Sequence, residues 1–183
     1  MQGTNYNQVI ADLKDRKLPS VESVKATLAQ AKDLIKKEPN VLKLEAPVVV
    51  IGNINGQLDD FIEILNKAGT PSADNRLLFL GDLVCRGKNS LETLLIALNL
   101  KLQYPDYVTI LRGKMEVAAI CDMYGFSHEV EEKYKDKEFK TSFFEVFDVL
   151  PLAATIGKKV IAIHGGISKN AKTLEDIEKI DRM

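Results

Sequence analysis

Four turns that contain glycine recur along this chain, and each follows a short, mostly apolar run of residues. The runs cover residues 48–51, 77–80, 108–111 and 160–163. The turns read Gly52-Asn53-Ile54-Asn55-Gly56, Gly81-Asp82-Leu83-Val84-Cys85-Arg86-Gly87, Gly113-Lys114-Met115-Glu116 and His164-Gly165-Gly166. A short apolar run that ends in a glycine turn predicts a buried strand with a loop at its carboxyl end. Because open α/β sheets bind ligands at that end, the sequence has the layout of an enzyme site.

Strand and helix patterns alternate after residue 47. Strands are expected at 48–52, 76–80, 107–111, 152–156 and 159–163, and Gly157-Lys158 predicts a hairpin between the last two. Helices are expected around 58–65 and 91–102, in segments over 116–149, and over 173–181. The apolar stripes of the helices at 58–65 and 91–102 indicate core faces rather than ligand sites. This alternation predicts an α/β fold with a largely parallel sheet covered by helices.

Residues 1–47 are expected to form a helical N-terminal cap. Ser20 is a plausible N-cap, and the apolar residues that follow recur at helical spacing up to Ile35. We therefore predict two parts of one structural unit, the cap at 1–47 and a partial α/β domain at 48–183. The chain stops one helix after a strand, so we expect the domain to be incomplete at Met183, with a sheet edge that pairs with a partner or with further chain.

The bulk composition restricts the class of protein. A length of 183 residues fits one domain, and a formal net charge of -1 gives no reason to expect nucleic acid or an anionic membrane as a partner. Two cysteines are too few for a disulfide framework and fit a reducing compartment. The first residues do not read as a signal peptide, and no run approaches a membrane span. We therefore expect a cytoplasmic protein, or one in a large intracellular assembly such as the cytoskeleton.

Seven segments, in this order and spacing, together resemble one protein family. They are Leu44-Glu45-Ala46-Pro47, Phe79-Leu80-Gly81-Asp82, Arg86-Gly87-Lys88-x-Ser90-Leu91-Glu92-Thr93, Leu111-Arg112-Gly113, Tyr124-Gly125-Phe126, Leu150-Pro151-Leu152-Ala153-Ala154 and His164-Gly165-Gly166-Ile167-Ser168. The family is the PPP serine/threonine protein phosphatases of the type-1 and type-2A kind. The resemblance covers about the first three-fifths of that family's catalytic domain. It implies an α/β (α+β) metallophosphoesterase-like sandwich of sheets, flanked by helices.

The resemblance also implies a reaction and its cofactors. Members of the family hydrolyse phosphoserine and phosphothreonine with two divalent metal ions, Mn, Fe or Zn, which activate a water molecule and clamp the phosphate. The five covered ligand positions carry matching residues at two places, Asp82 and His164. The other three hold Asn53, Asn55 and Lys114. An amide oxygen brings no charge and is a poorer donor than imidazole for zinc or iron.

The positions that donate the proton and contact the phosphate in the family are also only partly retained. Met115 stands at the position of the family's proton donor, and its thioether has no proton to give. Cys85 replaces the family's Asp that orients the proton donor. Arg86, which contacts phosphate in the family, and Glu116 are retained. General acid catalysis is typically worth about 10²–10⁴-fold, so its loss together with the metals predicts loss of nearly all activity.

Lys114 is expected to stand in for a metal by pairing with Asp82. Two unit charges about 4 Å apart interact by roughly 4 kcal/mol at an effective dielectric of about 20, so such a lysine would repel an incoming dication. The alternative is that Lys114 points to solvent.

Four other residues have a functional and a structural interpretation. Arg86 either binds a phosphate or pairs with Glu116 or another acid, and pairing is the favoured interpretation. Cys85 is interpreted as a small buried cysteine rather than a reactive thiol. His128 is expected to be exposed at a helix start. His164 is interpreted as a satisfied loop or core histidine rather than half of a metal site.

The sequence therefore predicts a catalytically inactive, phosphatase-like protein that serves as a structural or binding component of a larger assembly. No cofactor is expected in this interpretation, and protein partners would cover the incomplete sheet. The first alternative is an active metal-dependent serine/threonine phosphatase with a rearranged or partner-completed site. The weaker alternative is a phosphate-binding module that uses Arg86 and Arg112 without turnover.

Overall fold

The structure is a computed structural model, and it describes residues 5–182. The expectation about the chain end at Met183 lies outside the described residues. The helices are α1 (Tyr6–Lys14), α2 (Val21–Ile35), α3 (Leu58–Ala68), α4 (Ser90–Gln103), α5 (Ala118–Met123), α6 (Phe126–Tyr134), α7 (Lys140–Asp148) and α8 (Leu174–Glu178). The strands are β1 (Val41–Leu44), β2 (Val48–Ile51), β3 (Arg76–Phe79), β4 (Val108–Ile110), β5 (Ala153–Ile156) and β6 (Val160–Ile163).

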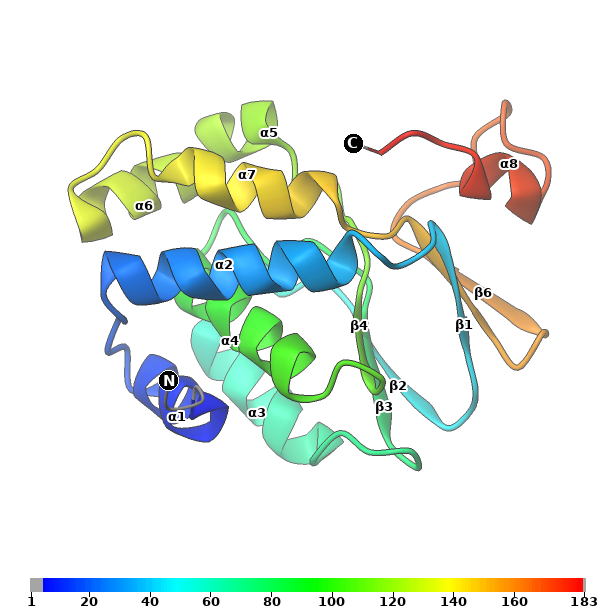
Figure 1. Cartoon of the computed structure of the whole chain (residues 1–183), viewed down its shortest axis with the longest axis horizontal. Coiled ribbons are helices and arrows are strands. Elements are labelled where there is room, and N and C mark those ends of the chain that lie inside the picture. Colours follow the sequence, from blue (N-terminus) through cyan, green and yellow to red (C-terminus); the bar gives the residue numbers. More distant parts are fainter. Residues whose placement is uncertain (1–4, 183) are drawn as a thin grey trace.

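The strands form two three-stranded sheets instead of the one largely parallel sheet that the alternation predicts. In the first sheet, β2, β3 and β4 are all parallel. In the second, β5 lies between β1, to which it is parallel, and β6, to which it is antiparallel. Figure 1 shows most of the helices on one side of β2–β4 and the second sheet on the other. The layers are therefore helices, sheet and sheet, which confirms the sandwich that the resemblance implies.

Two apolar clusters hold these layers together. The larger lies between the first sheet and the helices, and it includes residues from α1 and α2 as well as from the strands and α4. A smaller cluster between the two sheets contains Leu44, Leu78, Leu111, Ala154 and Ala162. Because the N-terminal helices contribute to the larger cluster, the cap and the rest of the chain share one core.

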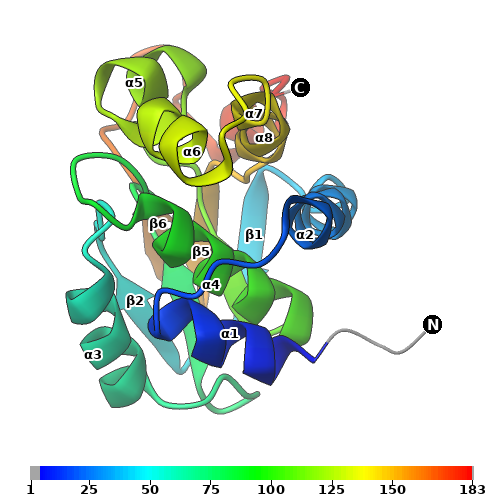
Figure 2. The same cartoon turned by 90° about the vertical axis from the view of Figure 1, so that its left-hand side faces the viewer.

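Helix α4 is the centre of the helical layer. Figure 2 shows it next to α1, α2 and α3, and its residues from Ser90 to Lys101 are all buried. Its N-terminus has no side-chain cap of its own, because Asn89 makes no capping hydrogen bond. The Glu129 carboxylate of α6 accepts hydrogen bonds from the backbone N–H groups of Ser90 (3.1 Å) and Leu91 (2.9 Å) instead. This contact satisfies two donors at the helix start and fixes α6 against α4.

The N-terminal region is largely helical but not entirely so. The Ser20 hydroxyl accepts a hydrogen bond from the backbone N–H of Ser23 at 3.3 Å, which confirms the predicted N-cap of α2. Strand β1 was not predicted within 1–47; it pairs with β5. Its four residues are too few for a clear period of two, and Lys43 in its middle is exposed.

The hairpin between β5 and β6 is confirmed. Gly157 and Lys158 both have left-handed backbone angles, with φ of +54° and +59°, as a two-residue type I′ turn requires. On β6, Val160 and Ile161 remain about half exposed. Within residues 5–182, no helix combines the length and the apolar character that a membrane span needs.

Candidate functional site

The predicted site residues lie in loops that are joined by backbone hydrogen bonds. The N–H groups of Ile54 and Asn55, after β2, donate to the Asp82 carbonyl at 3.0 and 2.8 Å. The loops after β3 and β4 are packed even more closely, because a Cβ atom added at Gly113 would lie 2.2 Å from the Asp82 nitrogen. The carboxyl ends of the three parallel strands therefore meet at one place, as the sequence layout predicts.

Glu116 is the group that holds the loops after β3 and β4 together. Its side chain is fully buried, and its carboxylate accepts hydrogen bonds from the N–H groups of Asp82 (2.8 Å), Leu83 (2.8 Å) and Gly113 (2.9 Å). Burial raises the pKa of Glu116, and the three N–H donors oppose that rise. In this structure Glu116 has a positioning role.

Asp82 collects several of the predicted residues around its carboxylate. Oδ1 accepts a hydrogen bond from the Met115 backbone N–H at 2.8 Å and lies 3.2 Å from Nε2 of His164. Oδ2 accepts from the Asn53 side-chain amide at 3.1 Å. Asp82 itself is buried and has a left-handed φ of +54°. The aspartate, the histidine and the first asparagine are thus brought together.

Both ring nitrogens of His164 have protein partners. Nδ1 lies 2.9 Å from the Leu80 carbonyl oxygen, and Nε2 faces Asp82. A histidine with both nitrogens engaged is the satisfied loop histidine that the sequence favours. Asn55 lies apart from this group, because its side-chain amide donates to the Val84 carbonyl at 3.3 Å.

The predicted ion pair between Lys114 and Asp82 is wrong. Lys114 is exposed, and it makes no ion pair with any acid among residues 5–182. The neighbouring Met115 is the residue that turns inward: its side chain is buried and its N–H binds Asp82. Because Met115 occupies the interior, Lys114 is directed to solvent, which was the stated alternative.

The predicted pairing of Arg86 with an acid is also wrong. Glu116 is occupied by backbone donors, and Arg86 forms no ion pair within the described part of the chain. Its guanidinium lies over the ring of Tyr124, 5.7 Å from the ring centroid. The backbone N–H of Arg86 donates to the Tyr124 carbonyl at 3.1 Å. Arg86 is exposed, so its charge remains open to solvent.

The other predicted residues lie as expected, and two partners were missed. Cys85 is fully buried, which confirms the structural interpretation of that residue. His128 is exposed on α6, and it lies 3.4 Å from Glu132. Tyr124 was named in a family-like segment but not as a partner of Arg86, and the contact of Cys121 with the Met115 carbonyl was not expected.

The side chains do not fit two divalent metal ions. Asp82 is the one carboxylate at the five ligand positions, and both of its oxygens already have protein partners. Lys114 brings a positive charge to the same loop cluster. Among residues 5–182, no three His, Cys, Asp or Glu side chains gather closely enough to hold a metal ion. A dication at these positions would find one carboxylate, one imidazole and the neutral amide of Asn53, too few donors for two metal ions.

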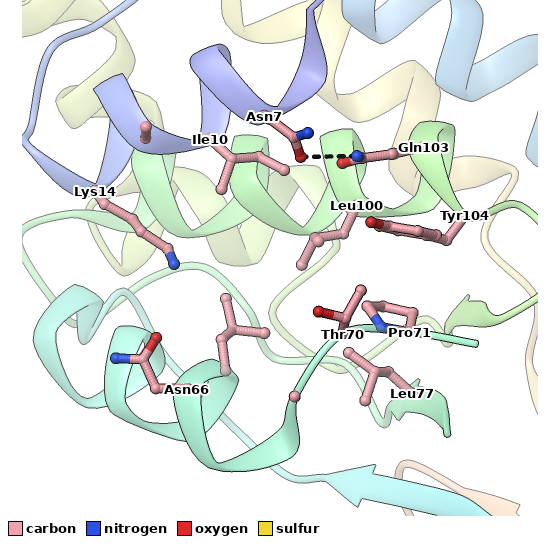
Figure 3. Close-up of a pocket in the computed structure, with 13 residues that line it drawn as sticks. Asn7, Ile10, Lys14, Asn66, Thr70, Pro71, Leu77, Leu100, Gln103 and Tyr104 are labelled. Atoms are coloured by element: carbon pink, nitrogen blue, oxygen red, sulfur yellow. Dashed lines mark hydrogen bonds between the residues drawn. The ribbon is translucent and has the colours of Figure 1, made fainter. Parts of the chain in front are cut away.

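The structure has one hollow next to this cluster and another away from it. The first, about 330 Å³, is lined by Lys114 and His164 together with apolar residues that include Val117, Ile163 and Ile167. The second, about 400 Å³, lies between α1, α3 and α4 (Figure 3). Figure 3 shows Lys14 and Tyr104 on its walls and a hydrogen bond of 2.8 Å from Gln103 to Asn7. Of the predicted site residues, Lys114, His164 and Arg112 line the first hollow, and none lines the second.

Comparisons with known proteins give the family. Residues 46–183 match the calcineurin-like phosphoesterase family. The chain is 39% identical to the serine/threonine-protein phosphatase 4 catalytic subunit of Saccharomyces cerevisiae over 97% of its own length and 58% of the relative's. It is 38% identical to the subunit of the same name from Kluyveromyces lactis, over 96% and 57%.

Solved structures agree with this assignment. A protein serine/threonine phosphatase from Saccharomyces cerevisiae with similarity to human phosphatase PP5 superposes with a TM-score of 0.87 at 31% identity, over 92% of this chain and 55% of that one. A cold-active protein-tyrosine phosphatase from Shewanella shares the fold, with a TM-score of 0.59 at 20% identity over 74% of this chain and 46% of that one. The chain belongs to the calcineurin-like phosphoesterases. Within them it is a PPP-type, serine/threonine phosphatase-like protein, and it spans less than three-fifths of the curated relatives it matches.

Proposed function

We propose that this chain is a pseudophosphatase, a phosphatase-like protein that keeps the fold and has lost the hydrolytic reaction. The observation that carries the proposal is Met115. Its thioether is buried at the position where the family resemblance places the proton donor, and a thioether cannot donate a proton to a leaving alkoxide.

The charges around Asp82 support the same proposal. One carboxylate faces His164 and an asparagine amide, where two metal ions would need several anionic or imidazole donors. Lys114 adds a cation at the edge of the cluster, and Cys85 replaces the carboxylate that orients the proton donor in the family. These substitutions fall in one site, while Glu116 still holds its loops together.

Exposed apolar surface supports the second part of the proposal, a role as a component of a larger protein assembly. Exposed apolar side chains lie on β2 (Val50), on β6 (Val160 and Ile161) and beyond it (Ile167 and Ile180). Exposed apolar side chains on these two edge strands support a protein partner rather than nucleic acid. We propose that this assembly is cytoplasmic, in line with the low cysteine count, with the cytoskeleton as one option.

Release of phosphate from a phosphoserine peptide tests the proposal. The purified chain, assayed with added Mn²⁺, is expected to release no phosphate above a protein-free blank. The phosphatase 4 catalytic subunit of Saccharomyces cerevisiae, assayed in parallel, is the positive control for the peptide and the buffer. Metal-dependent turnover by this chain that disappears in an Asp82→Ala variant would overturn the proposal.

The names of the relatives favour a second candidate, an active metal-dependent serine/threonine phosphatase. They are called catalytic subunits, and the chain matches 58% of the length of one of them. In that case a rearranged site, or one completed by another segment, would use Asp82 and His164 as ligands. The peptide assay separates the two candidates, because this one requires turnover.

The exposed position of Arg86 favours a third candidate, phosphate binding without turnover. Its guanidinium lies over Tyr124 and forms no ion pair in the described chain, so it is available to an anion. If this candidate holds, a fluorescent phosphoserine peptide binds the wild-type chain, and Arg86→Ala lowers its affinity by about tenfold, the loss of one charge-assisted contact. Equal binding by wild type, Arg86→Ala and the control Arg16→Ala would count against it.

A further inference from the structure

The hollow between α1, α3 and α4 has the size of a small-molecule site. Its volume is about 400 Å³, and ligand pockets typically enclose roughly 300–1,000 Å³. None of the residues that line it belongs to the loops of the candidate site. A ligand bound in this hollow would therefore be separate from any phosphate chemistry of the chain.

The base of the hollow is apolar. Ile10 of α1, Leu77 of β3 and Leu100 of α4 are buried there, and Leu65 of α3 is half-buried beside them. In the view of Figure 3, Ile10 and Leu100 lie between Lys14 at one end and Tyr104 at the other. Apolar surface of this kind favours the hydrocarbon part of a ligand over water.

Lys14 gives one end of the hollow a positive charge. It is the one charged residue among those that line the hollow, and it forms no ion pair or hydrogen bond within residues 5–182. Its side chain is half-buried, and Figure 3 shows it directed from α1 toward Asn66 of α3. A partly desolvated ammonium group with no acid beside it favours an anionic group on the ligand.

The opposite end carries hydrogen-bonding groups without partners. The Gln103 side-chain amide donates to Oδ1 of Asn7 at 2.8 Å, but its own oxygen is buried and accepts no hydrogen bond in the described part of the chain. The neighbouring Tyr104 hydroxyl likewise has no partner among residues 5–182. A buried acceptor without a donor is unfavourable, so a ligand hydroxyl that donates to Gln103 would be stabilised there.

The walls of the hollow are held in place by protein contacts. In the loop after α3, the Asn75 side-chain amide donates to the carbonyls of Ala68 (2.8 Å) and Thr70 (3.0 Å). Ser72 and Asn75 exchange two backbone hydrogen bonds, of 3.0 and 3.1 Å. The bond from Gln103 joins the end of α4 to α1. Because these walls are already ordered, a ligand would lose little affinity to the cost of ordering them.

We propose that this hollow binds a small aromatic hydroxy acid. The carboxylate pairs with Lys14, the ring packs against Ile10 and Leu100, and the hydroxyl bonds with Gln103 and Tyr104. One lysine matches the single charge of a carboxylate better than the nearly double charge of a phosphate monoester. The polar far end distinguishes the ligand from a fatty acid. This inference does not depend on the proposed loss of catalysis, because the two sites share no residue.

Titration of the full chain with para-hydroxyphenylpropionate tests the site. Calorimetry is expected to show one saturable site with a Kd of about 1 mM or tighter, as expected for a ligand of a dozen non-hydrogen atoms. In amide NMR spectra, the signals of Asn7, Thr70 and the Gln103 side chain should shift, and that of Gly113 should not. Binding that does not saturate, or shifts centred on the loops of the candidate site, would overturn the proposal.

Two analogues of this probe test the two ends of the hollow in the wild-type chain. The amide of hydroxyphenylpropionate lacks the charge, and phenylpropionate lacks the hydroxyl. Each is expected to bind about tenfold more weakly, the loss of one charged or buried hydrogen-bonded contact. Equal affinities for the three compounds would contradict the assigned orientation and overturn the proposal.

Variants place the charge on Lys14 itself. Lys14→Met keeps the apolar stem, and it should weaken binding of the acid about tenfold while leaving binding of the amide unchanged. Lys67→Met is the matched control, because Lys67 is an exposed lysine of α3 that does not line the hollow. Ala11→Trp places a large side chain at the exposed edge of the hollow and should abolish binding.

An equal loss of affinity in Lys14→Met and Lys67→Met would indicate general attraction of anions and would overturn the proposal. So would unchanged binding in Ala11→Trp. Thermal melting of each variant verifies its fold. The comparison of the three compounds uses the wild-type chain alone, so it decides the matter even if a variant fails to fold.

Discussion

Replacing Glu116 by alanine is expected to lower the free energy of unfolding by about 3–5 kcal/mol, because three backbone N–H groups lose a buried acceptor at once. Chemical denaturation followed by circular dichroism measures this loss. Since the N–H donors belong to Asp82, Leu83 and Gly113, the damage should be concentrated in the candidate site. Hydrogen exchange is expected to show faster exchange at these amides than at those of α2.

Two control variants show whether the loss of stability comes from the buried hydrogen bonds of Glu116 or from the loss of a negative charge. Glu116→Gln keeps one oxygen and turns an amide N–H toward one of the three donors, so its loss is expected to be smaller but clear. Glu63→Ala removes an exposed carboxylate paired with Lys67 and should leave the unfolding curve nearly unchanged. A similar curve for Glu116→Ala and Glu63→Ala would show that Glu116 does not hold the loops.

Gly113→Ala is the second change with a large expected effect, roughly 3 kcal/mol or more of stability, at the upper end of overpacking. The added Cβ would lie 2.2 Å from the Asp82 nitrogen and 2.5 Å from Oε2 of Glu116, which are both buried and fixed. The loops after β3 and β4 would have to move apart, and the hydrogen bonds to Glu116 would lengthen.

Gly165→Ala is a matched control for Gly113→Ala. A Cβ at Gly165 meets no atom within 4 Å, although this residue lies in the same site. Its melting temperature is expected to equal that of the wild type within error, and that of Gly113→Ala to fall by several degrees. Equal melting temperatures in the two variants would contradict the close approach of the loops.

Much of the fold could be predicted from local patterns. The Ser20 cap, the helix after it and the turn at Gly157-Lys158 each depend on neighbours in the sequence, and the structure confirms all three. Strand β1 could not be predicted, because its evidence is its pairing with β5, more than a hundred residues away. The division of the strands into two sheets could not be predicted either, because it too depends on pairing between distant segments.

The site residues could be named from the sequence, but their pairing could not. The family motifs locate Asp82 and His164, which the structure brings within 3.2 Å of each other. Whether the side chain of Lys114 or of Met115 turns inward depends on how the loop packs, and the apolar Met115 side chain is the buried one. Arg86 was expected to pair with Glu116 or another acid, yet backbone donors already occupy the Glu116 carboxylate.

The contacts that hold the loops of the site together do not depend on the side chains that differ from the family. Glu116, Gly113 and the hydrogen bonds from the loop after β2 to Asp82 join the loops of the site through protein contacts. A site that is stable on protein contacts alone can lose its ligands and its proton donor and still present a defined surface. Under the proposed loss of hydrolysis, these contacts would preserve the fold in a chain that binds rather than cleaves.

The number of divalent metal ions bound per chain tests this account most directly. Protein equilibrated with Mn²⁺ and Zn²⁺, freed of excess ions and analysed by plasma mass spectrometry is expected to carry no stoichiometric metal. The catalytic subunit of a yeast relative, treated identically, shows that the procedure retains bound ions. Two ions per chain that are lost together in Asp82→Ala and His164→Ala would contradict the account.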